Sequence, residues 1–393
     1  MEERYDFDKV VDRKGTNALK VDALEERYGD AGLIPLWVAD MDFETPPQVV
    51  EAMRERLNHP VFGYTMEPPG YWPAVINWLK ERHGWEVRRE WLSYVPGIVK
   101  GIGMVINVFT SRGDKVIIQS PVYHPFRLVP RGNGREVVYN PLRLAGDRYE
   151  MDFEQLERVI DERCKLLVLS NPHNPGGRVW ERETLATLAE ICERRGVIAV
   201  SDEIHADMGL FGHRHTPFMT VSEAAARVSI TFGAPSKSFN IAGLVSSFAV
   251  VPDDSLRRRF YSWLEANEFN EPTIFATIAT EAAYARCREW LDQMIAYVEG
   301  NVDFVDSYLR ERIPAIRVMR PQASFLAWLD CRGLGLGREA LVDLFVKGAR
   351  LALNDGEMFG PGGEGFMRMN VGTSRRVLER ALGQLEEAVK RGR

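Results

Sequence analysis

Residues that could do chemistry lie directly after short apolar runs of this sequence. Asp202 follows VIAVS, Tyr123 lies just beyond VIIQS, and Asn174 lies in the turn NPHNPGG after LLVLS. Lys237 follows SITFGAP. A lysine amine has a pKa of about 10.4 in water and becomes a nucleophile near neutral pH when burial or a nearby positive charge lowers that pKa. Lys237 is therefore a candidate for covalent bonding to a carbonyl group.

The elements that must position these residues are predicted by the apolar runs themselves. Runs typical of buried parallel strands alternate with longer segments of helical periodicity: WLSYV, DKVIIQS, KLLVLSN, GVIAVSDE, VSITFGAPSK and VSSFAVV. This alternation predicts an α/β fold with a mostly parallel sheet. Ligands of such sheets bind at the carboxyl ends of the strands, so we expect the turn residues to converge on one crevice.

The chain is long enough for more than one domain. We expect residues 1–45 to be an N-terminal segment that packs with a small domain, residues 46–285 to be the large domain, and residues 286–393 to be the small α+β domain. Apolar residues recur every three or four positions from Leu291 to Leu309, which predicts one long helix between the domains. Short strands are predicted at SFLAWLDC, ARLAL and GFMRMNVG, together with two helices.

Composition excludes several classes of protein. A net charge of -6 is unlike that of nucleic-acid-binding proteins, which are usually basic. The charged N-terminus is unlike a signal peptide, and no apolar stretch reaches the roughly 20 residues of a membrane span, so a cytoplasmic protein is expected. The four cysteines lack metal-ligand spacing and suit a reducing compartment, and His213 and His215 have no suitably spaced partner, so no metal site is predicted.

Taken together, the strand-end residues match the needs of pyridoxal phosphate. This cofactor requires a lysine, a carboxylate at its pyridine nitrogen, a donor to its ring hydroxyl, a side chain on each ring face, and a phosphate cradle at a helix N-terminus. Each residue alone has a simpler interpretation: Lys237 as a solvated surface charge, Asp202 as a helix N-cap, and NPHNPGG as a turn. Their occurrence together, each at a strand end, favours the cofactor site.

Longer motifs carry a resemblance to a known family. SNPHNPGG, SDEIHADM and APSKSFNIAGL resemble the aminotransferase superfamily with the type I fold of pyridoxal-phosphate enzymes, and the resemblance covers nearly the whole chain. LIPLWVADMDFETPP, GYT at residues 63–65 and SDEIHADM resemble the cystathionine β-lyase-like carbon–sulfur lyases, the MalY/PatB group, more closely than ordinary aminotransferases.

The resemblance implies a role for each cofactor-site residue. Lys237 is similar to the lysine that holds the cofactor as a Schiff base and moves the proton at the substrate α-carbon. Asp202 matches the pyridine-nitrogen carboxylate and Asn174 the donor to the ring hydroxyl. The remaining expected contacts are Tyr123 on one ring face, Ile204 or His205 on the other, and Ile98, Val99 and Ser236 at the phosphate. His205 could instead be a satisfied surface histidine.

The resemblance also implies a substrate site and a homodimer. Arg368 in GFMRMN matches the arginine that binds the substrate α-carboxylate through its bidentate fork, and Ala39 is expected beside the substrate. Tyr64 resembles a tyrosine that reaches the phosphate from the neighbouring subunit. The alternative interpretation is that Tyr64 packs within the large domain of its own subunit.

The sequence departs from the wider family at three places. Many aminotransferases have an arginine eight residues after the lysine, where this chain has Val245; the lyase group commonly lacks it too. Lys100 is a candidate replacement for that charge, with a solvated lysine as the alternative. Val21 in KVD, where relatives have tryptophan, and the segment NEFNEPTIF at residues 267–275 could reshape the substrate pocket.

Three functions remain open on the sequence alone. The first is β-elimination of a thiol from a cysteine-type amino acid, giving pyruvate and ammonia. The second is transamination by the same lysine, which needs a 2-oxo acid acceptor. The third is binding of a regulatory partner with secondary catalysis, although no partner-binding motif is recognisable.

Overall fold

The computed structural model describes residues 4–392 and contains a mixed seven-stranded sheet. Across the sheet the strands are β2 (Leu92–Val95), β10 (Ser247–Val250), β9 (Ser229–Gly233), β8 (Ile198–Asp202), β7 (Cys164–Ser170), β3 (Lys115–Ile118) and β4 (Glu136–Tyr139). Only β10 runs against its neighbours in this sheet, because it pairs antiparallel with both β2 and β9. The carboxyl ends of the other six strands therefore share one edge of the sheet, and β10 begins at that same edge.

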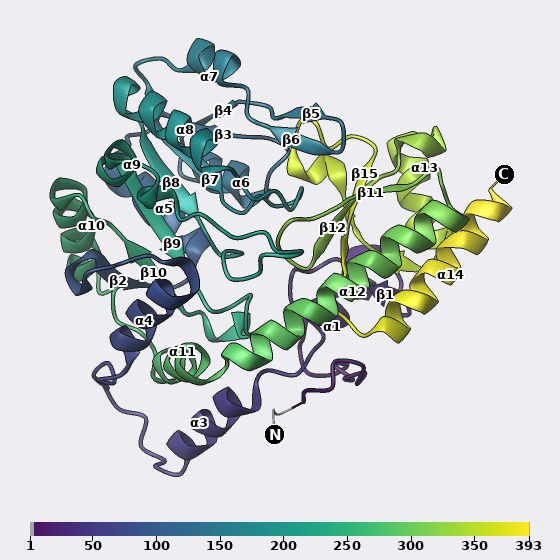
Figure 1. Ribbon diagram of the computed structural model, residues 1–393, viewed down its shortest axis with the longest axis horizontal. Helices are drawn as coiled ribbons and strands as arrows, with labels where there is room; N and C mark the ends of the chain where they lie inside the picture. Colours follow the sequence, from purple (N-terminus) through teal and green to yellow (C-terminus); the bar gives the residue numbers. More distant parts are fainter. Residues whose placement is uncertain (1–3, 393) are drawn as a thin grey trace.

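Side chains of the central strands alternate between two apolar cores. In β7, Leu166 and Val168 pack in the cluster that contains helix α5 (Ile98–Phe109), whereas Leu167 and Leu169 pack in the cluster that contains α8 (Arg182–Arg195). This two-residue period is the pleat of a strand that is buried on both faces, which explains why its sequence is a continuous apolar run. Helices thus cover both faces of the sheet (Figure 1).

The remaining helices around this sheet lie in its two outer layers or at its β2 side. They are α3 (Pro47–Leu57), α4 (Tyr71–His83), α6 (Pro125–Gly132), α7 (Phe153–Val159), α9 (Glu223–Val228), α10 (Asp254–Ala266) and α11 (Ile274–Arg286). A separate hairpin is formed by β5 (Arg143–Ala145) and β6 (Arg148–Glu150).

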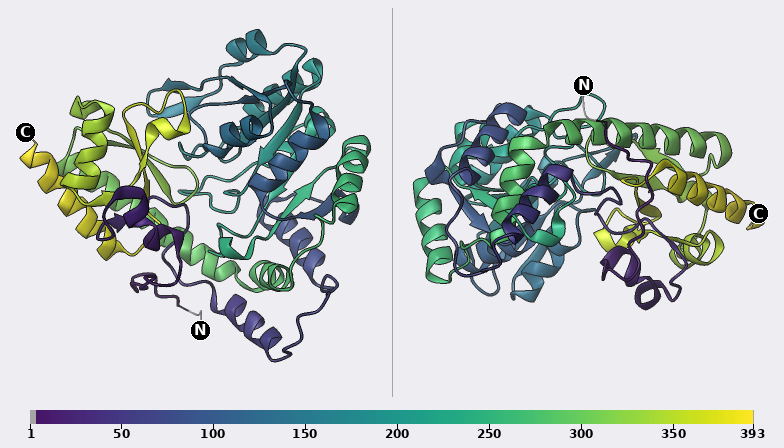
Figure 2. Two further views of the ribbon diagram at one scale, coloured as in Figure 1. Left: turned by 180° about the vertical axis from the view of Figure 1, so that it is seen from behind. Right: turned by 90° about the horizontal axis from the view of Figure 1, so that it is seen from below.

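A second, antiparallel sheet of four strands lies toward the C-terminus. Its order is β11 (Arg317–Met319), β12 (Leu326–Asp330), β15 (Phe366–Asn370) and β14 (Asn354–Asp355). Helices α13 (Arg338–Asp343) and α14 (Arg375–Arg391) complete this part. The long helix α12 (Arg288–Arg312) extends from α11 to α14 and so connects the two sheets (Figures 1 and 2).

The N-terminal segment joins the C-terminal part. After the short helices α1 (Leu19–Asp22) and α2 (Leu24–Tyr28), strand β1 (Ile34–Pro35) pairs in parallel with β13 (Leu351–Ala352). Tyr28 also donates its hydroxyl hydrogen to the carbonyl of Leu353 over 3.0 Å.

The strands predicted between residues 92 and 250, the long helix and the predicted C-terminal strands are confirmed. One strand of the large sheet, β4, was not predicted, and ARLAL contributes to the small β1–β13 pair and not to the four-stranded sheet. The domain boundaries near residues 45 and 285 stay predictions. Within residues 4–392 no helix combines the length and the apolar character needed to cross a membrane.

Candidate active site

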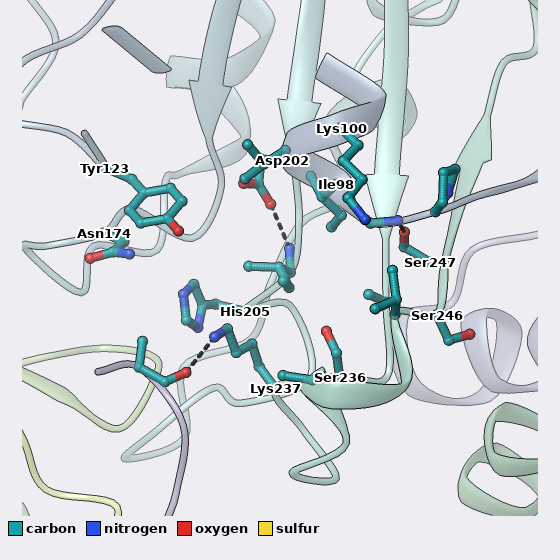
Figure 3. Close-up of a pocket in the computed structure, with 18 of the residues that line it drawn as sticks. Ile98, Lys100, Tyr123, Asn174, Asp202, His205, Ser236, Lys237, Ser246 and Ser247 are labelled. Atoms are coloured by element: carbon teal, nitrogen blue, oxygen red, sulfur yellow. Dashed lines mark hydrogen bonds between the residues drawn. The ribbon is translucent and has the colours of Figure 1, made fainter. Parts of the chain in front are cut away.

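A cavity of about 270 Å³ lies at the carboxyl edge of the large sheet, where the predicted residues meet. Figure 3 shows side chains from several strand ends turned toward it. The predicted residues that line the cavity are Ala39, Ile98, Val99, Lys100, Tyr123, Asn174, Asp202, Ile204, His205, Ser236 and Lys237. Most of the predicted site residues, although far apart along the chain, thus line one cavity.

Lys237 lies in the turn after β9 and is surrounded by protein atoms. Its amine donates a hydrogen bond to the carbonyl of Ala39, which belongs to the N-terminal segment (Figure 3). The pKa of Lys237 is lowered to about 8, chiefly by burial and also by the positive charges of Arg368 and Lys20, although Asp40 and Asp202 act to raise it. The amine is therefore a much better nucleophile near neutral pH than a solvated lysine.

The lowered pKa predicts how cofactor attachment depends on pH. The neutral amine is the reactive form, so the rate at which apoenzyme bonds to pyridoxal phosphate should be constant above pH 8 and fall about tenfold per pH unit below it. Stopped-flow absorbance of the reconstituting enzyme measures this rate. A rate that continues to rise between pH 9 and pH 10 would show that Lys237 titrates like a solvated lysine.

Asp202 ends β8 and presents a buried carboxyl group to the cavity. Its Oδ1 accepts a hydrogen bond from the backbone N–H of Ile204 over 3.1 Å, and its other oxygen has no hydrogen-bond partner within residues 4–392. Burial raises the pKa of Asp202 to about 7, although the Ile204 amide and Lys237 oppose this effect. A protonated ring nitrogen in the cavity would supply the missing partner and stabilise the ionised carboxylate.

The N-terminus of α5 provides backbone donors at the far end of the cavity. The amides of Ile98, Val99 and Lys100 have no acceptor in the described part of the chain. Gly97, with a φ of 100°, precedes them and donates its own N–H to Ser247 Oγ over 2.8 Å. Free first-turn amides and the positive end of a helix dipole bind phosphate groups, and Ser236 lines the same cavity.

Arg368 lies on β15 and is a buried cation without a carboxylate partner among residues 4–392. Its guanidinium donates to three neutral oxygens, Asn174 Oδ1 at 3.0 Å, the carbonyl of Trp37 at 3.0 Å and Asn354 Oδ1 at 2.7 Å. Burial lowers the pKa of Arg368 to about 10. A buried positive charge of this kind favours a ligand that brings a carboxylate.

The bond from Arg368 also orients Asn174. Because the amide oxygen of Asn174 accepts from Arg368, its nitrogen is left to donate, and Figure 3 shows this nitrogen turned toward the cavity. The backbone carbonyl of Asn174 accepts from the N–H of Tyr123 over 3.1 Å, which joins the turns after β7 and β3. The aromatic ring of Tyr123 and the amide of Asn174 are thus held together on one side of the cavity.

His205 and Ile204 lie beside Lys237 and Asp202, respectively. The interpretation of His205 as a surface histidine is wrong, because only 3% of the residue is exposed. Burial lowers the pKa of His205 to about 3, and Lys237 and Arg368 lower it too. His205 is therefore neutral at physiological pH and can pack against a flat ring without a charge.

Tyr64 does not reach this cavity within one subunit. Its side chain is fully exposed, so the alternative prediction that Tyr64 packs within its own domain is wrong.

Val245 lines the cavity at the position of the missing arginine and has a φ of 54°, a conformation that is strained for a β-branched residue. Sequence reasoning missed Ser246 and Ser247, which line the cavity because the antiparallel strand β10 begins there.

Comparisons with known proteins agree with this geometry. The family described as aminotransferase class I and II matches residues 31–385. The chain belongs to this family. It is 43% identical over 384 residues to cystathionine beta-lyase PatB of Bacillus subtilis (strain 168), covering 98% of this chain and 99% of the relative. It is 33% identical over 389 residues to protein MalY of Escherichia coli (strain K12), covering 98% and 99% of the two chains.

The solved structure of cystalysin from Treponema denticola, which contains pyridoxal 5′-phosphate, superposes with a TM-score of 0.96 at 32% identity, covering 100% of both chains. This member of the family therefore has the type I fold and is a pyridoxal-phosphate enzyme. The residues present fit the cofactor, because the incompletely bonded Asp202 carboxyl, the free amides of α5 and the lysine with a lowered pKa border one cavity.

Proposed function

We propose that this protein is a pyridoxal-phosphate-dependent carbon–sulfur β-lyase that releases a thiol from a cysteine-type amino acid and leaves pyruvate and ammonia. The observation that carries the proposal is Arg368, a buried cation without a carboxylate partner in the described residues, held next to a site built around Lys237. This arrangement suits an amino-acid substrate. Similarity to cystathionine β-lyases over nearly the full chain favours elimination over transamination.

Several residues of the cavity, together with Arg368, which bonds the cavity residue Asn174, have a task in this reaction. Lys237 would bond the cofactor in the resting enzyme, the substrate amine would displace it, and the freed Lys237 amine would then remove the α-proton of the substrate. Arg368 binds the α-carboxylate, while Asp202 holds a proton at the cofactor ring nitrogen. When bound, pyridoxal phosphate supplies an electron sink for the negative charge that develops at the α-carbon. A Cα=Cβ double bond would form as the Cβ–S bond breaks, and sulfur would leave as a thiolate that takes up a proton. Water would then hydrolyse the released enamine to pyruvate and ammonia.

The remaining residues bind and orient. Tyr123 and either Ile204 or His205 cover the two ring faces, Asn174 donates to the ring hydroxyl, and Ala39 borders the substrate. The amides of Ile98 and Val99, with the Ser236 hydroxyl, hold the phosphate. We expect residues 1–45 to be the N-terminal segment, 46–285 the large domain and 286–393 the small domain. Ala39 of the first region lines the cavity, and Arg368 of the third bonds the cavity residue Asn174.

A substrate screen tests the proposal. Purified enzyme is incubated with cystathionine and a panel of related thioethers, with and without a 2-oxo acid, and pyruvate and free thiol are measured together. Equal amounts of pyruvate and thiol without the oxo acid are expected. Absence of both products across the panel, or product that requires the oxo acid, would contradict the proposal and favour an aminotransferase.

Lys100 is proposed to offset part of the phosphate charge in place of an arginine at Val245. Its side chain is exposed and lines the cavity at the start of α5. Lys100→Ala should raise the dissociation constant of the cofactor about three- to tenfold at low salt, and the difference should shrink at 1 M salt because exposed charges are screened. Equilibrium dialysis of the cofactor measures this, with Lys100→Arg as the control. Unchanged affinity would show a merely solvated lysine.

We also propose a cytoplasmic homodimer in which Tyr64 completes the neighbour's site. Tyr64, Phe62 and Met66 are exposed on one segment, and large apolar side chains exposed in this way are typical of a surface that a second subunit covers. Tyr64, Phe62 and Phe275 line the same surface hollow, in which the ring centroids of Phe62 and Phe275 lie 6.2 Å apart.

Coexpression of two inactive variants tests the shared site. In a mixed dimer, the Tyr64→Ala subunit keeps Lys237 and the Lys237→Ala subunit keeps Tyr64. One of the two sites therefore has both native residues, and the other has neither. Random pairing should therefore restore about a quarter of the wild-type activity at limiting cofactor. Light scattering confirms the dimer mass. Mixed dimers without restored activity would place Tyr64 outside the neighbour's site.

A further inference from the structure

Behind the cavity, the carboxylate of Asp207 connects three segments that are distant in sequence. Its Oδ1 accepts hydrogen bonds from Trp78 Nε1 and His83 Nε2, both at 2.8 Å, and its Oδ2 accepts from Ser238 Oγ, also at 2.8 Å. Asp207 is 6% exposed and Ser238 is fully buried. Within the described residues, the carboxylate thus accepts from two ring nitrogens and one hydroxyl and has no lysine or arginine partner.

Two of the connected segments carry the reactive groups of the cavity. Asp207 lies in the turn that follows Asp202, where the N–H of Ala206 donates to the carbonyl of Glu203. Ser238 immediately follows Lys237, but only Lys237 lines the cavity. One carboxylate therefore joins the turn that carries the Asp202 carboxyl to the turn that carries the Lys237 amine.

The third segment anchors this joint to the body of the large domain. Trp78 and His83 lie on the last turns of α4, and the Trp78 ring stacks on Tyr284 with centroids 5.1 Å apart. Burial alone would raise the pKa of Asp207, but the bonds from His83, Trp78 and Ser238 outweigh burial and lower it. A charged acceptor strengthens all three hydrogen bonds.

We propose that Asp207 is a positioning residue, which holds the Lys237 turn through Ser238 and thereby fixes the lysine amine relative to Asp202. This inference rests on the proposed role of Lys237. The geometry needed for proton transfer at one carbon atom is narrow, so a small displacement of the amine costs rate although every reacting group is present. The inference assigns a function in the reaction to the last aspartate of SDEIHADM.

The chain offers a matched pair of variants. Ser238→Ala and Trp78→Phe each remove one hydrogen bond to the same carboxylate, but only the first lies on the turn of the lysine. Ser238→Ala should keep the cofactor bound, change its visible circular dichroism and lower kcat about 10- to 100-fold with KM changed less than about twofold. Trp78→Phe should leave the dichroism and kcat near wild-type values, because His83 still bonds the same Asp207 Oδ1 and keeps the carboxylate anchored to α4.

Two further measurements complete the test. Ser238→Thr keeps the hydroxyl and should recover the wild-type dichroism, whereas Asp207→Asn should resemble Ser238→Ala. Equal changes in Ser238→Ala and Trp78→Phe, or no change in either, would overturn the inference. Borohydride reduction and peptide mapping of the wild-type holoenzyme test the proposed function separately from the positioning role of Asp207. If the cofactor is attached to a residue other than Lys237, the proposed function is contradicted, whatever the variants show.

Discussion

Replacing Lys237 with alanine should abolish pyruvate release. Lys237 is proposed both to bond the cofactor and to remove the α-proton, and burial gives its amine a pKa of about 8 that suits both tasks near neutral pH. Loss of a nucleophile and a general base in one step should lower kcat at least about 10³-fold. The variant should also lose the borohydride-stable label that wild-type enzyme acquires from the cofactor.

The control for this variant is Lys347→Ala. Lys347 forms an exposed ion pair with Asp343 one helical turn away, so its removal should leave activity and labelling unchanged. Pyruvate release by Lys237→Ala within tenfold of wild type, with the cofactor still attached covalently, would contradict the assignment of the lysine.

Replacing Arg368 with methionine should weaken substrate use without weakening the fold. The substrate carboxylate would lose a charge-assisted, bidentate partner in a buried site, so kcat/KM should fall about 10²- to 10³-fold, mainly through KM. The free enzyme would meanwhile lose a buried cation whose described partners are all neutral oxygens. The free energy of unfolding should therefore change little, because removal of an uncompensated buried charge offsets the cost of leaving these three acceptors without a donor.

Steady-state kinetics and thermal unfolding of the holoenzyme measure both effects. Arg375→Met is the matched control, because Arg375 is seven residues away in the sequence and bonds Asn301 instead of the cavity residue Asn174. A kcat/KM of Arg368→Met within twofold of the wild-type value would show that the α-carboxylate binds elsewhere.

Much of the large sheet could be predicted because its strands are buried on both faces. Runs such as KLLVLSN and GVIAVSDE are continuous and apolar, and one polar residue near the end of each, Ser170 and Asp202, lines the cavity. The strand β4 was missed because its residues are exposed or only half-buried, so no such run marks it. The direction of β10 was not predicted either, since a buried antiparallel strand has the same apolar pattern as a parallel one.

Candidate site residues could be predicted where they lie at the end of a strand, and the family resemblance implied their roles. Lys237, Asp202 and Asn174 are of this kind, and the structure places all three on one cavity. No local sequence pattern marks a contact between segments that are distant along the chain. The bond between Trp78 and Asp207 spans 129 positions, and the bond between Arg368 and Trp37 spans 331, so only the folded chain reveals them.

The state of the bound cofactor after reaction with a thioether, in the absence of any 2-oxo acid, tests the central claim most directly. The enzyme is mixed with an excess of cystathionine, and pyruvate per active site is measured together with the absorbance spectrum. β-Elimination predicts many pyruvate molecules per site and a cofactor that returns to its original spectrum. Conversion of the cofactor to its amine form after one turnover, with no pyruvate, would contradict the account and identify an aminotransferase.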